Sequence, residues 1–309
     1  FVPNILSFAT EGKELFYGAV RAPLEHWAPW RIENDENVIT NSLGLTEVGE
    51  QLIDLLSPDR LLDILKNFSL FTTNKKRQRI KVICRFQQYE GTNKIVERVI
   101  NGNVKKGLIW HFQGSGKSLL MVFAAQKLRR AAQLKSPTII VLVDRVDLDT
   151  QISSTFNAAD VPNIESTDSI RELQEMLERD ARKIIISTIF KFKDAKPNMN
   201  TRDNIIVMVD EAHRTQEGDL GRQMRAALPN AFLFGLTGTP INRIDMNTFW
   251  AFGAENDKGG YLSRYTFQES IRDKATLKLH FEPRLVDIHI DSKAMDKSLE
   301  DYYESIALN

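Results

Sequence analysis

From about residue 94 onward, the hydrophobic positions fall into short continuous runs separated by amphipathic stretches. The runs do not alternate with polar residues, which is the pattern of strands covered on both faces of a sheet. They lie at 107–111, 138–144, 183–188, 205–210 and 232–237. Helical periodicity fills the intervals at 118–132, 169–181 and 219–227. Strands that alternate with helices predict right-handed crossovers and a parallel α/β sheet.

The residues before this region show a weaker pattern. Up to about residue 41 the chain is rich in aromatic and turn-forming residues, with a strand-like run at Leu15–Val20. Ser57-Pro58-Asp59 is typical of a helix start. Apolar residues then follow at helical spacing: Leu61, Leu62, Leu65 and Phe68.

The composition is ordinary for a soluble globular protein, with 42% hydrophobic and 27% charged residues among 309. No run of about 18 apolar residues occurs, which excludes a membrane-spanning helix. Cys84 is the one cysteine, so a disulfide framework and a cysteine-based zinc site are excluded. The chain opens on Phe1 without a signal peptide, and we expect a piece of a longer protein.

The zero net charge hides an uneven distribution. Residues 74–145 hold 16 basic and 3 acidic side chains, a net charge of +13. The flanking segments are acidic, with net charges of −6 for residues 1–73 and −7 for residues 146–309. The basic block suits a polyanion such as a nucleic acid or a nucleotide. A solvated face with its acidic partners elsewhere in the fold explains the charge equally well.

A glycine-rich loop follows the strand predicted at 107–111 and precedes a helix. Its glycines let backbone N–H groups turn toward phosphate oxygens, and the helix presents its positive end. In such a loop the lysine reaches the β- and γ-phosphates and the next hydroxyl binds Mg²⁺. The general pattern has glycine where this chain has His111. The loop residues are Gly114, Ser115, Gly116, Lys117 and Ser118.

Two adjacent carboxylates end the strand predicted at 205–210. A cation or a proton is needed to tolerate Asp210 and Glu211 there. We predict that Asp210 holds Mg²⁺, directly or through water, and that Glu211 orients and deprotonates the attacking water. His213 by itself is typical of an ordinary buried histidine. Together with the glycine-rich loop, the carboxylate pair predicts a nucleoside triphosphatase.

A third motif, Thr237-Gly238-Thr239-Pro240, ends the strand predicted at 232–237. Small hydroxyl residues at a strand end can bond a neighbouring carboxylate and sense a γ-phosphate. Taken alone, the string is a turn before a proline. Beside the other two motifs, the sensing role is favoured.

The three motifs, in this order, resemble motifs I, II and III of superfamily 2 helicases and translocases. Further strings resemble the motor/restriction subunit of type I restriction-modification enzymes, and the similarity covers nearly the whole chain. The strings are 18–31, 61–68, 110–118, 143–151, 187–192 and 210–216. The resemblance implies a RecA-like P-loop NTPase lobe, mostly a parallel sheet with helices on both faces, preceded by a small mixed segment.

The family's domain order implies three parts. Residues 1–45 would follow the nuclease domain as a linker, residues 46–284 would form the first RecA-like motor domain, and residues 285–309 would begin the connection to the second. The nuclease's metal-binding Asp and Glu-x-Lys are not found before residue 74, so DNA cleavage is not predicted here. No arginine-bearing motif VI follows Pro240. Because losing such an arginine costs about 10³–10⁵ in rate, little ATPase activity is expected from this chain by itself.

The resemblance also assigns roles to single residues. The string containing Arg85 and Gln88 resembles the Q motif, in which Gln88 would read the adenine edge, whereas a lone glutamine is ordinarily a surface residue. Coupling between ATP and DNA would fall to His213, Thr237 and Thr239. Three further residues would lie toward the DNA track: Arg145, Thr188 and Lys191.

The predicted function is that of an ATP- and Mg²⁺-dependent motor that moves the whole protein along double-stranded DNA before a separate nuclease domain cuts it. The implied partners are the methyltransferase (modification) and specificity subunits, with no membrane partner, in the cytoplasm of a bacterium or archaeon. Two alternatives stay open. One is another superfamily 2 helicase or repair translocase acting on DNA or RNA, and the other is a non-catalytic scaffold that binds ATP only to set a shape.

Overall fold

The computed structural model describes residues 5–32, 46–73, 78–143, 146–159, 161–179, 181–212, 219–240 and 248–278, with residues 282 and 297. The chain divides into two compact units, residues 1–276 and 277–309. All helices and strands given below lie in the first unit. No helix in the described part of the chain is both long and apolar enough to cross a membrane.

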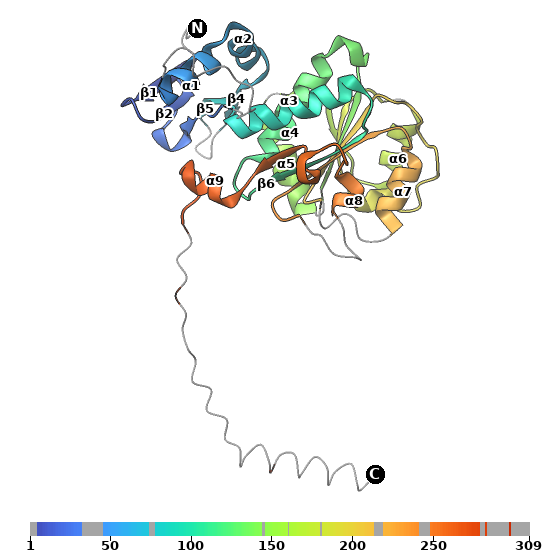
Figure 1. Ribbon diagram of the computed structural model, residues 1–309. Helices are drawn as coiled ribbons and strands as arrows, with labels where there is room; N and C mark the ends of the chain where they lie inside the picture. Colours follow the sequence, from blue (N-terminus) through green and yellow to red (C-terminus); the bar gives the residue numbers. More distant parts are fainter. Residues whose placement is uncertain are drawn as a thin grey trace. The chain divides into compact units, whose positions relative to one another are not determined.

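A seven-stranded sheet forms the centre of the first unit (Figure 1). The strand order is β12-β6-β11-β10-β7-β9-β8, and every neighbouring pair is parallel. All five predicted strands are confirmed, two of them without any shift of bounds. The two edge strands, of three residues each, are too short to show a pattern in sequence. The strands are β6 (Lys106–His111), β7 (Thr138–Val143), β8 (Ile164–Ser166), β9 (Ile184–Thr188), β10 (Ile205–Asp210), β11 (Phe232–Thr237) and β12 (Ser263–Tyr265).

Helices cover both faces of this sheet (Figure 1). One face packs on α3 (Phe86–Asn101), α4 (Lys117–Arg130) and α5 (Val146–Ala158). The other packs on α6 (Ile170–Glu178), α7 (Asp219–Ala227) and α8 (Thr248–Phe252). Short 3₁₀ turns lie at Leu24–His26, Ala132–Leu134, Ile189–Phe192 and Lys258–Gly260.

Burial on both faces explains the continuous apolar runs. Along β7, Ile139 and Val141 belong to one hydrophobic cluster, while Ile140 and Leu142 belong to the cluster on the opposite face. Side chains of a strand alternate between faces, so a strand covered on both sides needs apolar residues at every position. The predicted α/β class with a mostly parallel sheet is confirmed, and the arrangement is that of a RecA-like lobe.

A small mixed segment precedes the sheet, as expected. It contains one antiparallel sheet of β1 (Leu6–Thr10), β2 (Leu15–Ala19) and β3 (Ala28–Pro29). Two helices follow, α1 (Glu47–Leu56) and α2 (Pro58–Asn67), and then a hairpin of β4 (Ser69–Thr73) and β5 (Arg79–Ile83). Helix α9 (Phe267–Arg272) follows β12.

Helix α2 starts where its sequence predicts, but its buried face is different. Ser57 is the N-cap and Pro58 opens the helix. The side chain of Leu62 is 63% exposed, whereas Ile64 and Phe68 are fully buried. The helical spacing of the apolar residues therefore does not by itself identify the buried face, because the helix turns Ile64 toward the core and leaves Leu62 in solvent.

Aromatic packing joins the N-terminal sheet to the lobe. Trp30 is fully buried, with ring centroids 5.2 Å from Phe86 and 5.5 Å from Tyr17. Its Nε1 donates a hydrogen bond of 2.7 Å to Asp54 Oδ2. The neighbouring Arg31 guanidinium forms an ion pair with Asp273, just after α9. Residues 5–32 thus share a core with the lobe that contains the parallel sheet.

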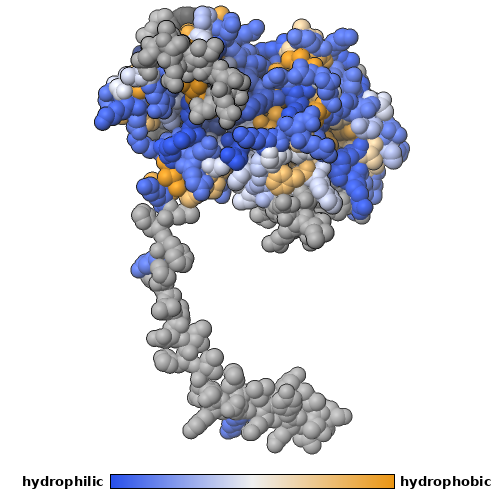
Figure 2. Space-filling view, in the orientation of Figure 1, coloured by the Kyte–Doolittle hydropathy of each residue, from blue (hydrophilic) through white to orange (hydrophobic). Residues whose placement is uncertain are grey.

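The surface of this unit is mainly hydrophilic in the view of Figure 2, where apolar residues gather in small groups. Trp250 on α8 is 76% exposed. Trp250 is therefore an exposed tryptophan with which the buried Trp30 can be compared.

We expect Trp30→Ala to lower the free energy of unfolding by about 3–5 kcal/mol, because the substitution removes a large buried aromatic side chain. Urea denaturation followed by far-UV circular dichroism measures this change. The matched control is Trp250→Ala, for which we expect a change within about 0.5 kcal/mol. Equal stability of the two variants would show that residues 5–32 do not share the lobe's core.

Candidate nucleotide-binding site

The three motifs of the sequence meet at the carboxyl ends of neighbouring strands. Strand β11 lies between β6 and β10, and all three run parallel, so their ends share one edge of the sheet. The Trp110 indole Nε1 donates a hydrogen bond of 3.1 Å to the Gly238 carbonyl. A Cβ added to Gly238 would lie 3.6 Å from Lys117 Nζ. The threonine turn therefore lies directly beside the glycine-rich loop.

The loop between β6 and α4 has the backbone of a phosphate cradle. Gly114 and Gly116 have φ angles of +83° and +87°, a region that favours glycine. A Cβ on Gly116 would also lie 2.2 Å from Gln88 Nε2. Helix α4 begins at Lys117, so its N-terminus faces the loop. The Ser115 hydroxyl is buried with no hydrogen-bond partner among the described residues, which fits an oxygen-rich ligand.

The first turn of α3 holds the loop in place. Gln88 Nε2 donates hydrogen bonds to the carbonyls of Gly116, at 3.1 Å, and Ser115, at 3.4 Å. Gln88 Oε1 accepts a hydrogen bond of 2.8 Å from the backbone N–H of Arg85. Gln87 Nε2 adds a further contact of 3.4 Å to the Ser115 carbonyl. Both amide side chains are buried. Two glutamines thus fix the carbonyls of Ser115 and Gly116.

Asp210 is a buried carboxylate without a hydrogen-bond donor on one oxygen. Its Oδ1 has no partner among the described residues, and the residue is 8% exposed. Burial, and then the adjacent Glu211, raise the pKa of Asp210 to about 6, while Lys117 opposes the shift. The Glu211 backbone is left-handed, with φ of +49°. An unbonded buried carboxylate oxygen fits a divalent cation such as Mg²⁺.

His111, at the position where the loop pattern has glycine, is fully buried. Its Nε2 lies 2.8 Å from Ser263 Oγ, and that hydroxyl also bonds the Glu90 carboxylate. Burial, helped by the charges of Lys117 and Lys94, lowers the pKa of His111 to about 3, so the ring is neutral. A Cβ on Gly91 would lie 3.2 Å from His111 Cε1. The imidazole is thus packed between β12 and α3, away from the phosphate cradle.

A family model described as SWI2/SNF2 ATPase matches residues 87–308. The chain belongs to the SWI2/SNF2 ATPase family. The match begins within α3 and includes the glycine-rich loop, the carboxylate pair and the threonine turn.

Relatives of this SWI2/SNF2 ATPase chain are restriction subunits. The type I restriction enzyme HindI endonuclease subunit of Haemophilus influenzae is 34% identical over 91% of the chain. The putative type I restriction enzyme MjaIXP endonuclease subunit of Methanocaldococcus jannaschii is 29% identical over 99% of it. The chain spans 29% and 31% of the lengths of these relatives. The predicted resemblance to type I restriction subunits is confirmed.

Among solved structures, the UvsW helicase of bacteriophage T4 is similar at 19% identity and a TM-score of 0.42, over 60% of this chain and 61% of that one. A score this low does not assign the fold, which rests on the strand order and the loop.

Most of the predicted nucleotide-site residues gather at one edge of the sheet in this ATPase lobe. The glycine-rich loop follows β6, and Asp210 is the last residue of β10, with Glu211 next to it. At the end of β11, the backbone N–H of Thr239 donates a hydrogen bond of 3.1 Å to Thr237 Oγ1. His213 lies outside the described residues. The chemical roles of all the predicted nucleotide-site residues stay predictions.

The residues predicted to face DNA are placed less favourably for contact with a ligand than the nucleotide-site residues. Thr188, at the end of β9, is 3% exposed. Lys191 bonds the carbonyl of Thr167 within the chain. Arg145 lies outside the described residues. The DNA role of these three residues stays a prediction.

The contact of Gln87 with the loop and the hydrogen-bonded network of His111, Ser263 and Glu90 were not predicted from the sequence. Gln87 is adjacent to a residue that the resemblance does single out, so its position was the available signal. No signal in the sequence points to Ser263, because it lies 152 residues from His111 and belongs to a three-residue strand.

We expect Asp210→Asn to raise the free energy of unfolding by up to about 3 kcal/mol at pH 7.5. The raised pKa means that the folded chain binds the proton more tightly than the unfolded chain, so ionisation destabilises the fold as pH rises from about 4 to about 6. Each pKa unit corresponds to about 1.4 kcal/mol. Urea denaturation without Mg²⁺ between pH 4 and 8 measures the effect, which should vanish near pH 4.

The control is Asp203→Asn, an exposed carboxylate just before the same strand, which should change stability by less than about 0.5 kcal/mol. A gain from Asp210→Asn that persisted unchanged at pH 4 would contradict the assigned cause.

Proposed function

We propose that this chain is the ATP-binding lobe of the motor in a type I restriction endonuclease subunit. The observation that carries the proposal is the buried Oδ1 of Asp210, which has no hydrogen-bond partner among the described residues and lies near Lys117 and a glycine cradle. A cation and a polyphosphate together satisfy all three features. The restriction subunits of Haemophilus influenzae and Methanocaldococcus jannaschii support the choice among SWI2/SNF2 ATPases.

In this proposal the chain's residues divide the chemistry of phosphoryl transfer. The N–H groups at 114 and 116–118 and the Lys117 ammonium would bind the phosphates. Ser118 and Asp210 would hold Mg²⁺, which would supply positive charge to the phosphate oxygens. Glu211 would orient the attacking water and accept its proton. The hydroxyl groups of Thr237 and Thr239 would sense the γ-phosphate.

The whole protein would use ATP to move along double-stranded DNA. Binding by phosphate contacts makes affinity fall steeply with salt and carries no sequence information. Sequence choice would therefore belong to a specificity subunit and protection of the host DNA to a methyltransferase subunit. The resemblance implies that the activating arginines belong to a second lobe, so we expect the 309-residue chain by itself to hydrolyse ATP slowly.

In the full-length protein, Glu211→Gln should slow DNA-stimulated ATP hydrolysis by about 10²–10⁴, the usual contribution of a general base, and leave ATP affinity within a few-fold. Lys117→Ala should abolish ATP binding. Steady-state ATPase assays and equilibrium binding of ATP measure the two effects. Glu178→Gln, an exposed glutamate on α6, is the matched control and should leave both unchanged.

The same assays separate the alternatives. Stronger stimulation by duplex RNA than by duplex DNA would favour a different superfamily 2 enzyme. Normal ATPase and translocation rates in both Lys117→Ala and Glu211→Gln would reject the motor assignment of these residues. A wild-type full-length protein that binds ATP but shows no DNA-stimulated hydrolysis would leave the scaffold.

A further inference from the structure

The start of the glycine-rich loop is attached to β12 and α9. The backbone N–H of Phe112 donates a hydrogen bond of 2.9 Å to the Tyr265 carbonyl. The centroid of the Phe112 ring lies 4.7 Å from that of Phe267, the first residue of α9. The Phe112 carbonyl in turn accepts a hydrogen bond of 3.1 Å from the Ser115 N–H, which closes the first turn of the loop. The position of Phe112, and with it this turn, therefore depends on where α9 lies.

The opposite end of α9 is held by Arg31, from the N-terminal segment. The guanidinium donates hydrogen bonds of 3.1 Å to the Glu269 carbonyl, 3.1 Å to Asp273 Oδ1 and 3.3 Å to Glu269 Oε1. The side chains of Arg31 and Asp273 are only 16% and 10% exposed. A cation is favourable at the C-terminal end of a helix, and the planar guanidinium fork binds several acceptors at once, which a lysine ammonium does not do in the same geometry. Arg31 therefore fixes where α9 ends.

Tyr265 connects the two ends of α9. Its Oη donates a hydrogen bond of 2.8 Å to Asp273 Oδ2, and its ring lies 5.6 Å from the Arg31 guanidinium carbon. Its carbonyl is the acceptor of the Phe112 N–H. Burial, and then the Asp273 charge, raise the pKa of Tyr265, so the phenol keeps its proton and stays the donor. One residue thus contacts both the arginine and the start of the loop.

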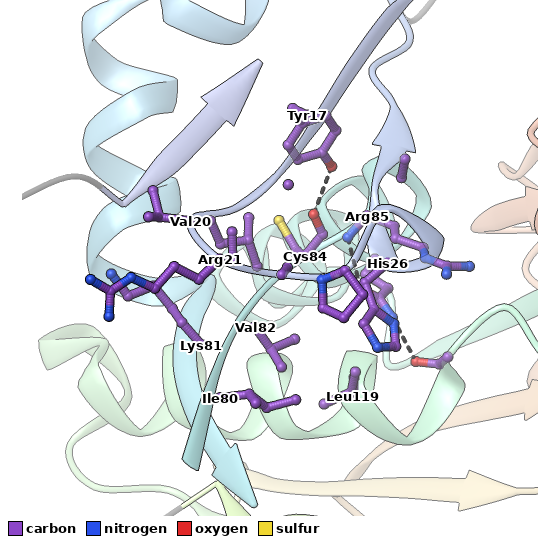
Figure 3. Close-up of a pocket in the computed structure, with 18 of the residues that line it drawn as sticks. Tyr17, Val20, Arg21, His26, Ile80, Lys81, Val82, Cys84, Arg85 and Leu119 are labelled. Atoms are coloured by element: carbon purple, nitrogen blue, oxygen red, sulfur yellow. Dashed lines mark hydrogen bonds between the residues drawn. The ribbon is translucent and has the colours of Figure 1, made fainter. Parts of the chain in front are cut away.

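The backbone that carries Arg31 is itself fixed to the lobe. Strand β3 ends one residue before Trp30 and pairs with β2. On β2, Tyr17 Oη donates a buried hydrogen bond of 2.6 Å to the Cys84 carbonyl, which joins β2 to the end of β5 (Figure 3). Arg31 therefore follows a sheet that cannot shift freely against the lobe, and it can serve as an anchor for α9.

A second contact joins the same two parts of the chain. Lys274 Nζ lies 3.1 Å from Glu14 Oε2, and both side chains are more than half exposed, at 66% and 54%. Exposed ion pairs of this kind contribute little to stability. The pair lies at the surface, whereas Arg31 is packed against Tyr265. It therefore provides a matched contact for measuring what attachment of the N-terminal segment does by itself.

We propose that Arg31 is a positioning residue for the glycine-rich loop, which it aligns through Asp273, Tyr265 and α9. In this arrangement Arg31 touches no phosphate and acts by holding Phe112, and with it the turn closed by Ser115. The inference rests on the proposed nucleotide binding at the loop. It goes further by assigning part of the loop's alignment to a residue outside residues 87–308, the part that matches the ATPase family.

The test is a double-mutant cycle on ligand affinity in the 309-residue chain. Arg31→Lys keeps the charge but loses the fork, so ATP affinity should fall about tenfold. Phe112→Ala should weaken binding similarly, and adding Arg31→Lys to it should change the affinity by less than about twofold, because the link is already broken. Isothermal titration calorimetry with Mg²⁺ measures these changes for ATP and for inorganic tripolyphosphate. Both affinities should fall in the same proportion, since the effect acts on the phosphate-binding turn. The control, Glu14→Gln, should change neither.

Effects of Arg31→Lys and Phe112→Ala that multiply would show that the two residues act independently, and would overturn the proposal. A loss confined to ATP, or an equal loss in Glu14→Gln, would also overturn it, because attachment of the N-terminal segment would then be the cause. Phe267→Ala provides a second variant that leaves Arg31 in place and removes the stacked ring, and unchanged affinity there would contradict the link. Failure of the wild-type chain to bind either probe would instead refute nucleotide binding at the loop.

Discussion

Parallel pairing of β6, β11 and β10 is the constraint on which the site depends. In this register Asp210 lies beside Leu236, and Thr237 lies beside Trp110. The backbone N–H of Ala212 bonds the Leu236 carbonyl at 3.0 Å, which continues the alignment past the strand end. A slip of one residue would turn each side chain to the other face. The carboxylate would then leave the cradle, and its burial would have no compensating cation.

The basic block at residues 74–145 resolves into two groups of side chains. Arg79, Lys81 and Arg85 line a cavity beside the glycine-rich loop, and Lys117 begins α4 at that loop. Others form ion pairs within the fold, including Arg98 with Asp257 and Lys127 with Asp63. The interpretation that acidic partners lie elsewhere in the fold therefore holds for part of the block, and binding of a polyanion by the rest stays a prediction. A net charge of +13 overstates the field that an anionic ligand meets.

The sequence predicts what depends on local pattern. The buried strands and the three motifs follow from runs of apolar residues and from spacing, and the structure has them at one sheet edge. What it could not predict depends on contacts between distant residues. Ser263 contacts His111 across 152 positions, and the aromatic packing of Trp30 on Phe86 joins residues 56 positions apart without any periodic signal. The cavity beside the glycine-rich loop could not be predicted for the same reason, because residues 17–28, β5 and the loop line it together.

Position 111, where the loop pattern has glycine, carries a histidine in this chain, and the glycine that makes room for it is Gly91 on α3. The imidazole of His111 fits because Gly91 has no side chain, and a methyl group there would also press on Leu120, 2.9 Å away. A glycine at 111 alone would leave a void beside Ser263, and a larger residue at 91 alone would displace the ring. The space that Gly91 leaves and the bulk of His111 thus match each other, so a side chain at 91 could be accommodated only if the residue at 111 were smaller or the imidazole moved.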